Sequence, residues 1–383
     1  MKLCKIKISN LRNHSYTNLE LAEHLNVFYG LNGAGKTTIL EAVAICSFTK
    51  TFQSVPENSL IKENETFYQA RVDGESEVGV SYFTNVNFEL NSKKKISGSE
   101  GDNLSAKDIV GRIPLIILSP DMKAITSGAP ADRRSFIDRT LSQISPLYMQ
   151  DLMRLKRCLK QRNSLLTAAK KERRLDNEQF NILTGIFIDL SVNIVYKRYN
   201  FIKEFQPYFS SFYANIGSSD ESVAIAYLPD TAQPALSSGD KSHIRSAFIE
   251  RAKDLRNYEI MRGTTLFGPQ KDDLFISINN SPAKERASQG QHKSLLISLK
   301  FAEFLYLKDI LEETPIILLD DIFSELDIER SRKVIELINQ NGAQSLITIT
   351  NPARLQSFEP VGSNRYFKIN AGIVEQIQDK YEP

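Results

Sequence analysis

The chain has 383 residues, of which 41% are hydrophobic, 25% charged and 9% aromatic, and its formal net charge is +2. This length predicts two or three domains, and the composition excludes a disordered or collagen-like chain and a histone-like polycation. Three widely spaced cysteines and four scattered histidines argue against a disulfide framework and a metal site built on Cys or His. Without a signal-peptide core or an apolar run of about 20 residues, we expect a soluble cytoplasmic protein with no membrane partner.

The first third of the chain alternates strand and helix patterns. Periodic apolar residues predict two strands and then an apolar helix, at 3–8, 25–29 and 37–46. Alternating apolar and polar residues at 78–82 and 86–90 predict a β-meander. The polar stretch 91–103 predicts a loop, and the continuous apolar run 113–118 predicts a buried strand.

The middle of the chain changes to a helical period. Apolar residues recur at helical spacing over 148–166 and 183–194, which predicts a hairpin of helices of about 20 residues and ~30 Å each. The last third returns to an α/β pattern, with predicted strands and helices at 275–278, 294–307, 316–319, 328–338 and 345–350. We therefore predict a head (1–118 and 263–383) split by a helical insertion (119–262).

A glycine-rich loop follows the second predicted strand and opens the first predicted helix. Its sequence matches GxxxxGK[ST], a pattern whose backbone N–H groups and helix N-terminus bind phosphate. We expect Lys36 to neutralise the β- and γ-phosphates of a nucleotide and Thr37 to ligate Mg²⁺. The alternative is a chance glycine-rich turn, which the flanking strand and helix disfavour. The candidate nucleotide-binding residues are Gly30, Leu31, Asn32, Gly33, Ala34, Gly35, Lys36 and Thr37.

Two carboxylates end the buried strand predicted at 316–319. Asp320 is a candidate Mg²⁺ ligand together with Thr37, and Asp321 is placed to orient a water molecule; with Lys36 they form the candidate catalytic set. The alternative is a helix N-cap, a common role of aspartates at such positions. Only the pairing with the glycine-rich loop favours the catalytic interpretation.

A third polar segment lies just before the helix predicted at 294–307. Ser288, Gly290 and Gln291 form an SxGQ segment that suits an anion site at a helix start, although an N-cap serine in a turn is the commoner meaning of such a segment. The order of the motifs is the stronger signal, because SxGQ, the acidic strand and a Ser-Glu-Leu-Asp turn ending at Asp327 follow the glycine-rich loop. That order resembles the plan of ATP-binding-cassette (ABC) ATPases, which bind ATP between two subunits.

Three longer stretches resemble the RecF family of bacterial recombinational repair proteins, in the SMC/Rad50-like group. The first runs from Pro120-Asp121 through Gly128-Ala-Pro-Ala-Asp-Arg-Arg-Ser-Phe-Ile-Asp138, with Thr126 at a usually aliphatic position. The second is 268–273, Gly-Pro-Gln-Lys-Asp-Asp, in which Gln270 and Lys271 replace the usual His and Arg. The third is 319–327, Leu-Asp-Asp-Ile-Phe-Ser-Glu-Leu-Asp.

The resemblance implies an α/β fold, namely an ABC-type P-loop ATPase head with a β-meander lobe and an inserted α-helical arm. It also implies ATP and Mg²⁺ as cofactors, an ATP-dependent homodimer on DNA and slow DNA-stimulated hydrolysis. Partnership with RecO and RecR in loading RecA at gaps and junctions, within the SOS response and replication restart, is implied too. By the same resemblance, Arg12 is a nucleotide-contacting arginine, Asp121 lies near the Q-loop and Thr350 near the switch-histidine position.

The predicted helical insertion is basic. Nine basic residues outnumber two acidic ones between Asp151 and Arg174, a local net charge of +7. Such a run binds DNA phosphates without reading sequence, or else forms a solvated helix face. The candidate DNA-binding residues are Arg154, Arg157, Lys160 and Lys171, with residues 93–95 as a second basic candidate. Arg133 and Arg134 are interpreted as phosphate ligands or as ion-pair partners of Asp138 and Asp132.

Other P-loop proteins remain as alternatives. A transporter ATPase subunit has no reason to carry the stretch 120–138 or a basic hairpin, and a long-armed SMC or Rad50 protein has a far longer insertion. A small-substrate kinase or GTPase needs neither SxGQ nor Ser-Glu-Leu-Asp. A DNA clamp that binds ATP without hydrolysing it also stays open.

Overall fold

The computed structural model describes residues 1–217, 220–231, 236, 239–352 and 362–378. Its contacts divide the chain into two compact units. Unit 1 comprises Met1–Lys123, Phe212–Ser219 and Gln289–Pro383, and unit 2 comprises Ala124–Ser211 and Asp220–Ser288. Residues 263–288, which we predicted as part of the head, cluster with unit 2, because Asp273–Ile278 pairs there with Val223–Leu228.

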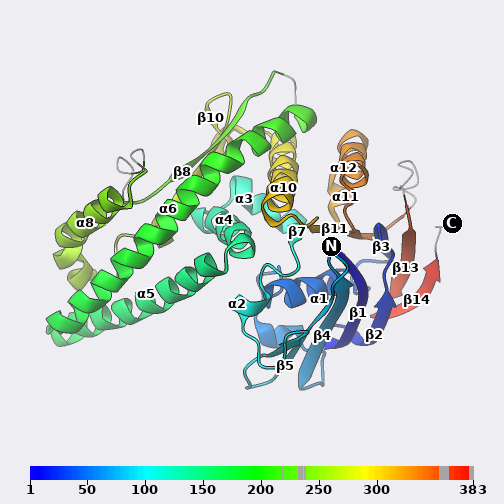
Figure 1. The fold of residues 1–383 in the computed structure, drawn as a ribbon, viewed down its shortest axis with the longest axis horizontal. Coiled ribbons are helices and arrows are strands. Elements are labelled where there is room, and N and C mark those ends of the chain that lie inside the picture. Colours follow the sequence, from blue (N-terminus) through cyan, green and yellow to red (C-terminus); the bar gives the residue numbers. More distant parts are fainter. Residues whose placement is uncertain (218–219, 232–235, 237–238, 353–361, 379–383) are drawn as a thin grey trace. The chain divides into compact units, whose positions relative to one another are not determined.

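Unit 1 contains two sheets (Figure 1). The six-stranded sheet has the order β14 (Ile373–Gln378), β13 (Asn364–Asn370), β3 (Leu25–Tyr29), β12 (Ser345–Ile349), β11 (Ile316–Asp320) and β7 (Leu115–Leu118). Its strands are parallel except β14, which forms a hairpin with β13. The antiparallel sheet has the order β2 (His14–Glu20), β1 (Lys2–Leu11), β4 (Phe67–Glu75), β5 (Ser81–Glu89) and β6 (Lys95–Gly98).

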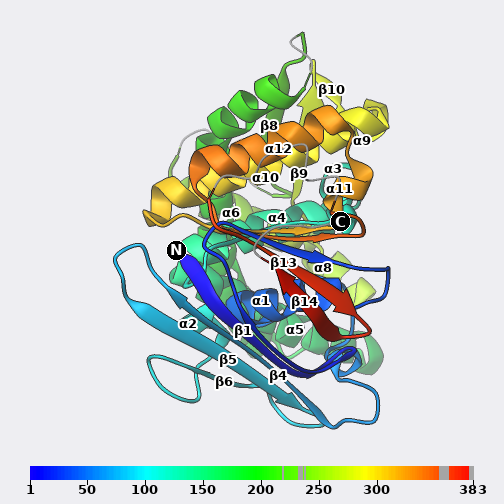
Figure 2. The same ribbon diagram turned by 90° about the vertical axis from the view of Figure 1, so that its right-hand side faces the viewer.

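Helix α1 (Lys36–Phe48) lies between the two sheets (Figure 2). It contacts β1, β4 and β5 of one sheet and β11 and β12 of the other. Because both sides are covered, apolar residues occur on every side of the helix, and its polar residues lie mainly in the first turn and at Glu41. Helices α10 (Gln289–Leu311) and α12 (Ile328–Asn341) lie on the opposite side of the six-stranded sheet.

The antiparallel sheet differs in detail from the prediction. Strand β5 is continuous from Ser81 to Glu89, whereas Val78 and Val80 lie in the turn before it and are 83% and 61% exposed. Strand β6 lies inside the stretch predicted as a loop. Periodicity alone misplaced these elements because the alternation of apolar residues runs on through the turn, while β6 is a short, polar edge strand.

Unit 2 is mainly helical. Its long helices are α4 (Pro130–Ile144), α5 (Pro146–Glu172), α6 (Asn177–Ile216) and α8 (Lys241–Arg262). The predicted hairpin is present as α5 and α6, with 27 and 40 residues rather than about 20, and the last turn of α6 is assigned to unit 1. A small sheet has the order β10 (Ser281–Pro282), β9 (Asp273–Ile278) and β8 (Val223–Leu228). Among the described residues of both units, the short helices are η1 (Glu57–Leu60), α2 (Ala106–Ile109), η2 (Pro120–Lys123), α3 (Ala124–Ser127), η3 (Pro269–Lys271), α9 (Ala283–Arg286) and α11 (Ile322–Glu325).

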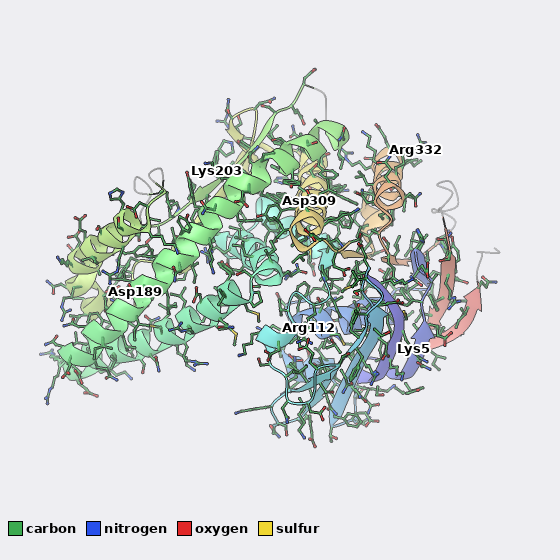
Figure 3. All side chains as sticks on the ribbon, in the orientation of Figure 1. Lys5, Arg112, Asp189, Lys203, Asp309 and Arg332 are labelled. Atoms are coloured by element: carbon green, nitrogen blue, oxygen red, sulfur yellow. The ribbon has the colours of Figure 1, made fainter. Side chains whose placement is uncertain are left out.

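Helix α6 is long and apolar enough, by length and composition alone, to cross a bilayer. It is the single such helix in the described part of the chain, and 44% of its most apolar window is buried. Its buried phenylalanines Phe187, Phe201 and Phe205 belong to the core of unit 2, which accounts for the composition. On its exposed side, Asp189 accepts from Arg245 of α8 at 2.9 Å (Figure 3).

Several charged residues of unit 2 serve as internal cross-links. Arg133 forms a bidentate pair with Asp273 at 2.7 and 2.9 Å, and Arg134 donates to the Asp272 carbonyl at 2.7 Å. Arg198, which is 2% exposed, joins Asp138 to Asp272. The phosphate-ligand interpretation of Arg133 and Arg134 therefore gives way to a structural one, with Asp273 and the Asp272 carbonyl as the partners rather than Asp132 and Asp138.

Arg162 is one of the nine basic residues between Asp151 and Arg174, but it is buried in an ion pair and is therefore not available to bind a ligand. The side chains of Arg162 and Glu259 are 0% exposed and form two hydrogen bonds of 3.0 and 2.6 Å. Arg162 also donates to Thr265 Oγ1 at 2.8 Å and stacks over the ring of Phe180. Sequence spacing gave no sign of this, since the pair joins residues 97 positions apart.

Removing one member of this pair leaves the other charge buried and unpaired. We expect Arg162→Met to lower the free energy of unfolding by about 3–5 kcal/mol, measured by urea denaturation followed by circular dichroism. The matched control is Lys156→Met, an exposed position on the same helix, where we expect a change of about 0.5 kcal/mol or less. Equal effects of the two substitutions would contradict the assignment of Arg162–Glu259 as a buried cross-link.

Candidate nucleotide-binding site

The glycine-rich loop connects the end of β3 to the start of α1, and two of its glycines are packed closely against neighbouring atoms. Gly35, the residue before α1, has φ of 107°, and a Cβ there would lie 2.6 Å from His14 Nε2. Gly30 has φ of 148°, and a Cβ would lie 2.2 Å from the Ile369 carbonyl oxygen. Both positions therefore require glycine. The α1 N-terminus has no side-chain cap, so its first N–H groups remain available to an anion.

Lys36 folds back over the loop from which it comes. Its Nζ donates to the carbonyls of Gly30 and Leu31 at 2.8 and 2.9 Å. Burial lowers the pKa of Lys36, and the nearby charges of Asp321 and Asp320 oppose that shift. The ammonium group is thus bound by main-chain carbonyls of the P-loop, where a bound phosphate group would lie next to it.

Thr37 and Asp320 lie side by side although 283 positions separate them. Thr37 Oγ1 donates to Asp320 Oδ1 at 2.7 Å, and Thr348 Oγ1 donates to the same oxygen at 2.8 Å. Burial raises the pKa of Asp320 above its ordinary value, while the bonds from Thr37 and Thr348 lower it. A hydroxyl and a carboxylate in contact are the pair of oxygen ligands that Mg²⁺ takes in P-loop sites.

Asp321 follows directly and has an unusual backbone conformation. Its φ is 49°, in the left-handed region, and its Oδ1 is buried without a hydrogen-bond partner among the described residues. A buried carboxylate oxygen without a donor is uncommon and calls for an explanation. A water molecule or ligand in the adjoining cavity is the partner that the arrangement suits.

A cavity of about 760 Å³ opens beside these groups, entirely within unit 1. Arg12 reaches its wall from the end of β1 and is held there by Glu41 of α1, at 3.0 and 3.2 Å, and by Gln53 at 2.9 Å. The lining includes six of the predicted nucleotide-binding residues, namely Arg12, Asn32, Gly33, Gly35, Lys36 and Thr37, and the predicted catalytic residue Asp321. Four other predicted site residues do not line the cavity, namely Gly30, Leu31, Ala34 and Asp320. Gly30 and Leu31 accept hydrogen bonds from Lys36, Asp320 accepts one from Thr37, and Ala34 is part of the loop.

Other lining residues were missed by sequence reasoning. They are Asn13, Thr38, Glu41, Gln53, Ser59, Ile61, Lys62, Glu63 and Thr348. Glu41 had a visible signal, as a charge in an otherwise apolar helix. Thr348 had a weaker one, as a polar residue in an apolar strand. The segment 53–63 has no motif, and only the fold brings it to the cavity.

Two positions suggested by the family resemblance lie elsewhere. Asp121 is exposed in η2, and Thr350 is exposed just after β12; neither lines the cavity. The polar residue that β12 contributes is Thr348, two positions earlier, because β12 and β11 pair in parallel with Thr348 opposite Asp320.

The SxGQ segment lies at the start of α10. Ser288 is exposed and immediately precedes the helix, whose first turn contains Gly290 and Gln291. Within unit 1, neither Gly290 nor Gln291 is among the residues that line the cavity. The start of α10 is tied instead to the Ser-Glu-Leu-Asp turn: Arg330 donates twice to Ser294 Oγ at 3.1 Å, and it contacts Asp327, the N-cap of α12.

The basic candidates on α5 lie at its surface. Arg154, Arg157, Lys160 and Lys171 are exposed and have no acidic partner among the described residues. At 100° per residue they fall within about 120° of the helix circumference. Lys94 of the second basic candidate differs, because it pairs with Glu57 at 2.7 Å and donates to the Thr49 carbonyl.

The comparisons with known proteins agree with this architecture. The family model for the RecF/RecN/SMC N terminal domain matches residues 2–362. The chain is 34% identical over 365 residues to the DNA replication and repair protein RecF of Chloroherpeton thalassium, covering 91% of this chain and 95% of that one. For RecF of Prosthecochloris aestuarii the identity is 37% over 355 residues, covering 93% and 95%.

Solved structures extend the match to the whole fold. Two structures of the recombination mediator protein RecF in the RecFOR pathway, one with ATPrS and one with ATP, are 28% identical to this chain. Their TM-scores are 0.89 and 0.88, with 97% and 98% of this chain covered and 97% of each RecF chain. An Smc head domain from Pyrococcus furiosus, at 13% identity and a TM-score of 0.56, shares the fold alone.

These matches confirm the predicted fold class, an ABC-type ATPase head with an inserted helical arm. They also confirm the resemblance drawn from the three motif stretches. By sequence and by structure, the chain belongs to the RecF family of DNA replication and repair proteins.

Proposed function

We propose that the chain is an ATP-dependent DNA-binding protein of recombinational repair, which dimerises on DNA at gaps and junctions and hydrolyses ATP slowly with DNA stimulation. The observation that carries the proposal is the contact between Thr37 and Asp320 beside the P-loop cavity. Folding brings the two halves of a phosphoryl-transfer site together from opposite ends of the chain. If Thr37 and Asp320 had a purely structural role, their contact would not need to lie beside a cavity.

In this proposal the P-loop binds the phosphates of ATP. The N–H groups of Gly33, Gly35 and the α1 N-terminus face the phosphate oxygens, and Lys36 exchanges its two carbonyl partners for the β- and γ-phosphates. Thr37 and Asp320 would hold Mg²⁺, which supplies charge neutralisation when bound. Arg12 lines the cavity, is held in place by Glu41, and contacts the nucleotide in this proposal.

Asp321 is the residue that we assign to the attacking water. Its buried Oδ1 has no donor among the residues that the structure describes, and the residue lines the cavity. Many ABC ATPases have glutamate in this place, and the shorter aspartate reaches less far toward the γ-phosphate. A slow hydrolytic step follows from that reach.

The SxGQ segment completes the site from a second subunit in this proposal. Ser288 is exposed, and Gly290 and Gln291 begin a 23-residue helix whose N-terminus suits an anion. Their absence from the cavity wall of their own head supports action in trans. The Arg330 contacts with Ser294 and Asp327 tie the segment to the turn that lies at ABC dimer interfaces.

The exposed basic face of α5 is proposed to contact DNA backbone. Arg154, Arg157, Lys160 and Lys171 have no acidic partners among the described residues, so their charges are available to phosphates. The name of the RecFOR pathway, given to the two solved relatives, supports RecO and RecR as partners, with RecA loading as the outcome. The proposed action on DNA implies a cytoplasmic protein.

The first prediction concerns Asp321. Because Asn keeps the shape but cannot accept a proton, we expect Asp321→Asn to slow single-turnover ATP hydrolysis by about 10²-fold or more. Affinity for ATP, measured with a fluorescent analogue, should stay within about twofold, and the ATP-bound dimer should accumulate on DNA. Unchanged hydrolysis would transfer the catalytic role to another residue.

The second prediction tests the composite site. Lys36→Ala should abolish ATP binding, whereas Ser288→Arg should leave ATP binding by the monomer normal and block ATP-dependent dimerisation. A mixture of the two variants then contains one intact composite site per mixed dimer. Partial recovery of dimerisation, measured by light scattering with ATP, is the expected result. Normal dimerisation of Ser288→Arg alone would contradict action in trans.

The third prediction concerns the arm. Reversing charge at Arg154, Arg157 and Lys160 together should weaken DNA binding and reduce the log–log salt slope by about one unit per lost phosphate contact. The matched control reverses three other exposed basic residues of unit 2, Lys203, Arg251 and Lys253, and so changes net charge equally. Equal loss of slope in both triple variants would indicate a non-specific charge effect rather than a binding face.

A further inference from the structure

The Thr348 hydroxyl is buried at the proposed catalytic site and contacts both of its acidic residues. Thr348 lies in β12 and is fully buried. It is paired with Asp320 of the neighbouring strand β11. Its Oγ1 donates to Asp320 Oδ1 at 2.8 Å and accepts from the Asp321 backbone N–H at 2.9 Å. It thereby contacts both adjacent acidic residues at once.

The hydroxyl has a defined direction in this arrangement. The hydroxyl has a single hydrogen to donate, and it donates this hydrogen to Asp320, because the Asp321 N–H can act only as a donor. Thr37 donates to the same Oδ1 from the opposite element, α1. Two donors on one oxygen fix the plane of the carboxylate, and Oδ2 has no protein donor among the described residues. A second strand and a helix therefore fix the orientation of Asp320.

The second contact of Thr348 fixes the main chain of Asp321. That residue has φ of 49°, a region that a non-glycine residue occupies at some energetic cost. Its N–H is bound by Thr348, and its carbonyl accepts from Ser324 Oγ at 2.7 Å. With both backbone groups held, the side chain is directed to the cavity wall, where its Oδ1 is buried and has no hydrogen-bond partner in the described part of the chain.

From these contacts we propose that Thr348 is a positioning residue, which sets the orientation of Asp320 for the metal and of Asp321 for the attacking water. The inference rests on the proposed ATPase function and deepens it. It also predicts a division of roles, since Thr348 has no place among the groups expected to meet the phosphates. Loss of its hydroxyl should therefore affect metal use and turnover more than nucleotide affinity.

The test compares Thr348→Val, which keeps the shape and removes the hydroxyl, with Thr348→Ser, which keeps the hydroxyl. For Thr348→Val we expect kcat to fall by about tenfold to a hundredfold, the range for losing a hydrogen bond to a charged group. A second readout is independent of turnover: the affinity for ATPγS measured with Mg²⁺ and with EDTA. The variant should keep the affinity seen in EDTA and lose most of the gain that Mg²⁺ provides in the wild type.

A control on the same strand separates positioning from packing. Ser345→Ala removes another buried hydroxyl of β12, which has no hydrogen-bond partner among the described residues, and it should match the wild type in both readouts. Thr348→Ser should recover kcat to within about threefold of wild type. Thermal melting accompanies each measurement, and the serine variant keeps the test valid if the valine variant is poorly folded.

The outcomes distinguish this inference from the proposed function. A wild-type protein that neither binds nor hydrolyses ATP would overturn the proposed function itself. An active wild type with an equally active Thr348→Val, or with a serine variant as impaired as the valine variant, would overturn the positioning role alone. Selective loss of the Mg²⁺-dependent gain, recovered by serine, would establish it.

Discussion

The proposed catalytic centre depends on one carboxylate oxygen, Asp320 Oδ1, which accepts from Thr37 and from Thr348. Each of the three residues lies at or next to the end of a different element: α1, β11 and β12. Their meeting requires parallel strands, because only then do the carboxyl ends of β3, β11 and β12 lie at one edge of the sheet. The packing of α1 between two sheets holds the P-loop at that edge. Loss of any of these contacts would separate groups that phosphoryl transfer needs within a few ångströms.

The C-terminal hairpin adds a constraint that the P-loop sequence does not show. Gly372, in the turn between β13 and β14, donates its N–H to the Ala34 carbonyl at 2.8 Å, and a Cβ on Gly30 would clash with the Ile369 carbonyl. The loop that binds phosphate is thus shaped partly from its own sequence and partly from residues about 340 positions later. Close backbone packing of this kind leaves glycine as the residue that fits.

The helical unit uses charge in two different ways. Arg162, Arg198 and Arg133 are buried and matched to carboxylates, so they fix how helices and strands of unit 2 join. The basic residues proposed for DNA are exposed and unmatched in the described chain. The buried pairs are costly to break because each charge has left water, whereas the exposed charges gain their energy from a partner's phosphates. Two of the family motifs, 120–138 and 268–273, contribute residues to these buried pairs and are joined through Arg133 and Arg198.

The amino-acid sequence alone predicts the class of the fold, the P-loop with its strand and helix, the acidic strand and the helical insertion, because these follow from local periodicity and short motifs. It could not separate Arg162 from its exposed neighbours, place Thr348 instead of Thr350 at the site, or assign Gln53 and Lys62 to the cavity. Each of those depends on contacts between residues far apart in the chain, such as the parallel register of β11 and β12. Local patterns decide which elements form, whereas strand pairing and burial, which depend on contacts across the whole fold, decide which side chains meet.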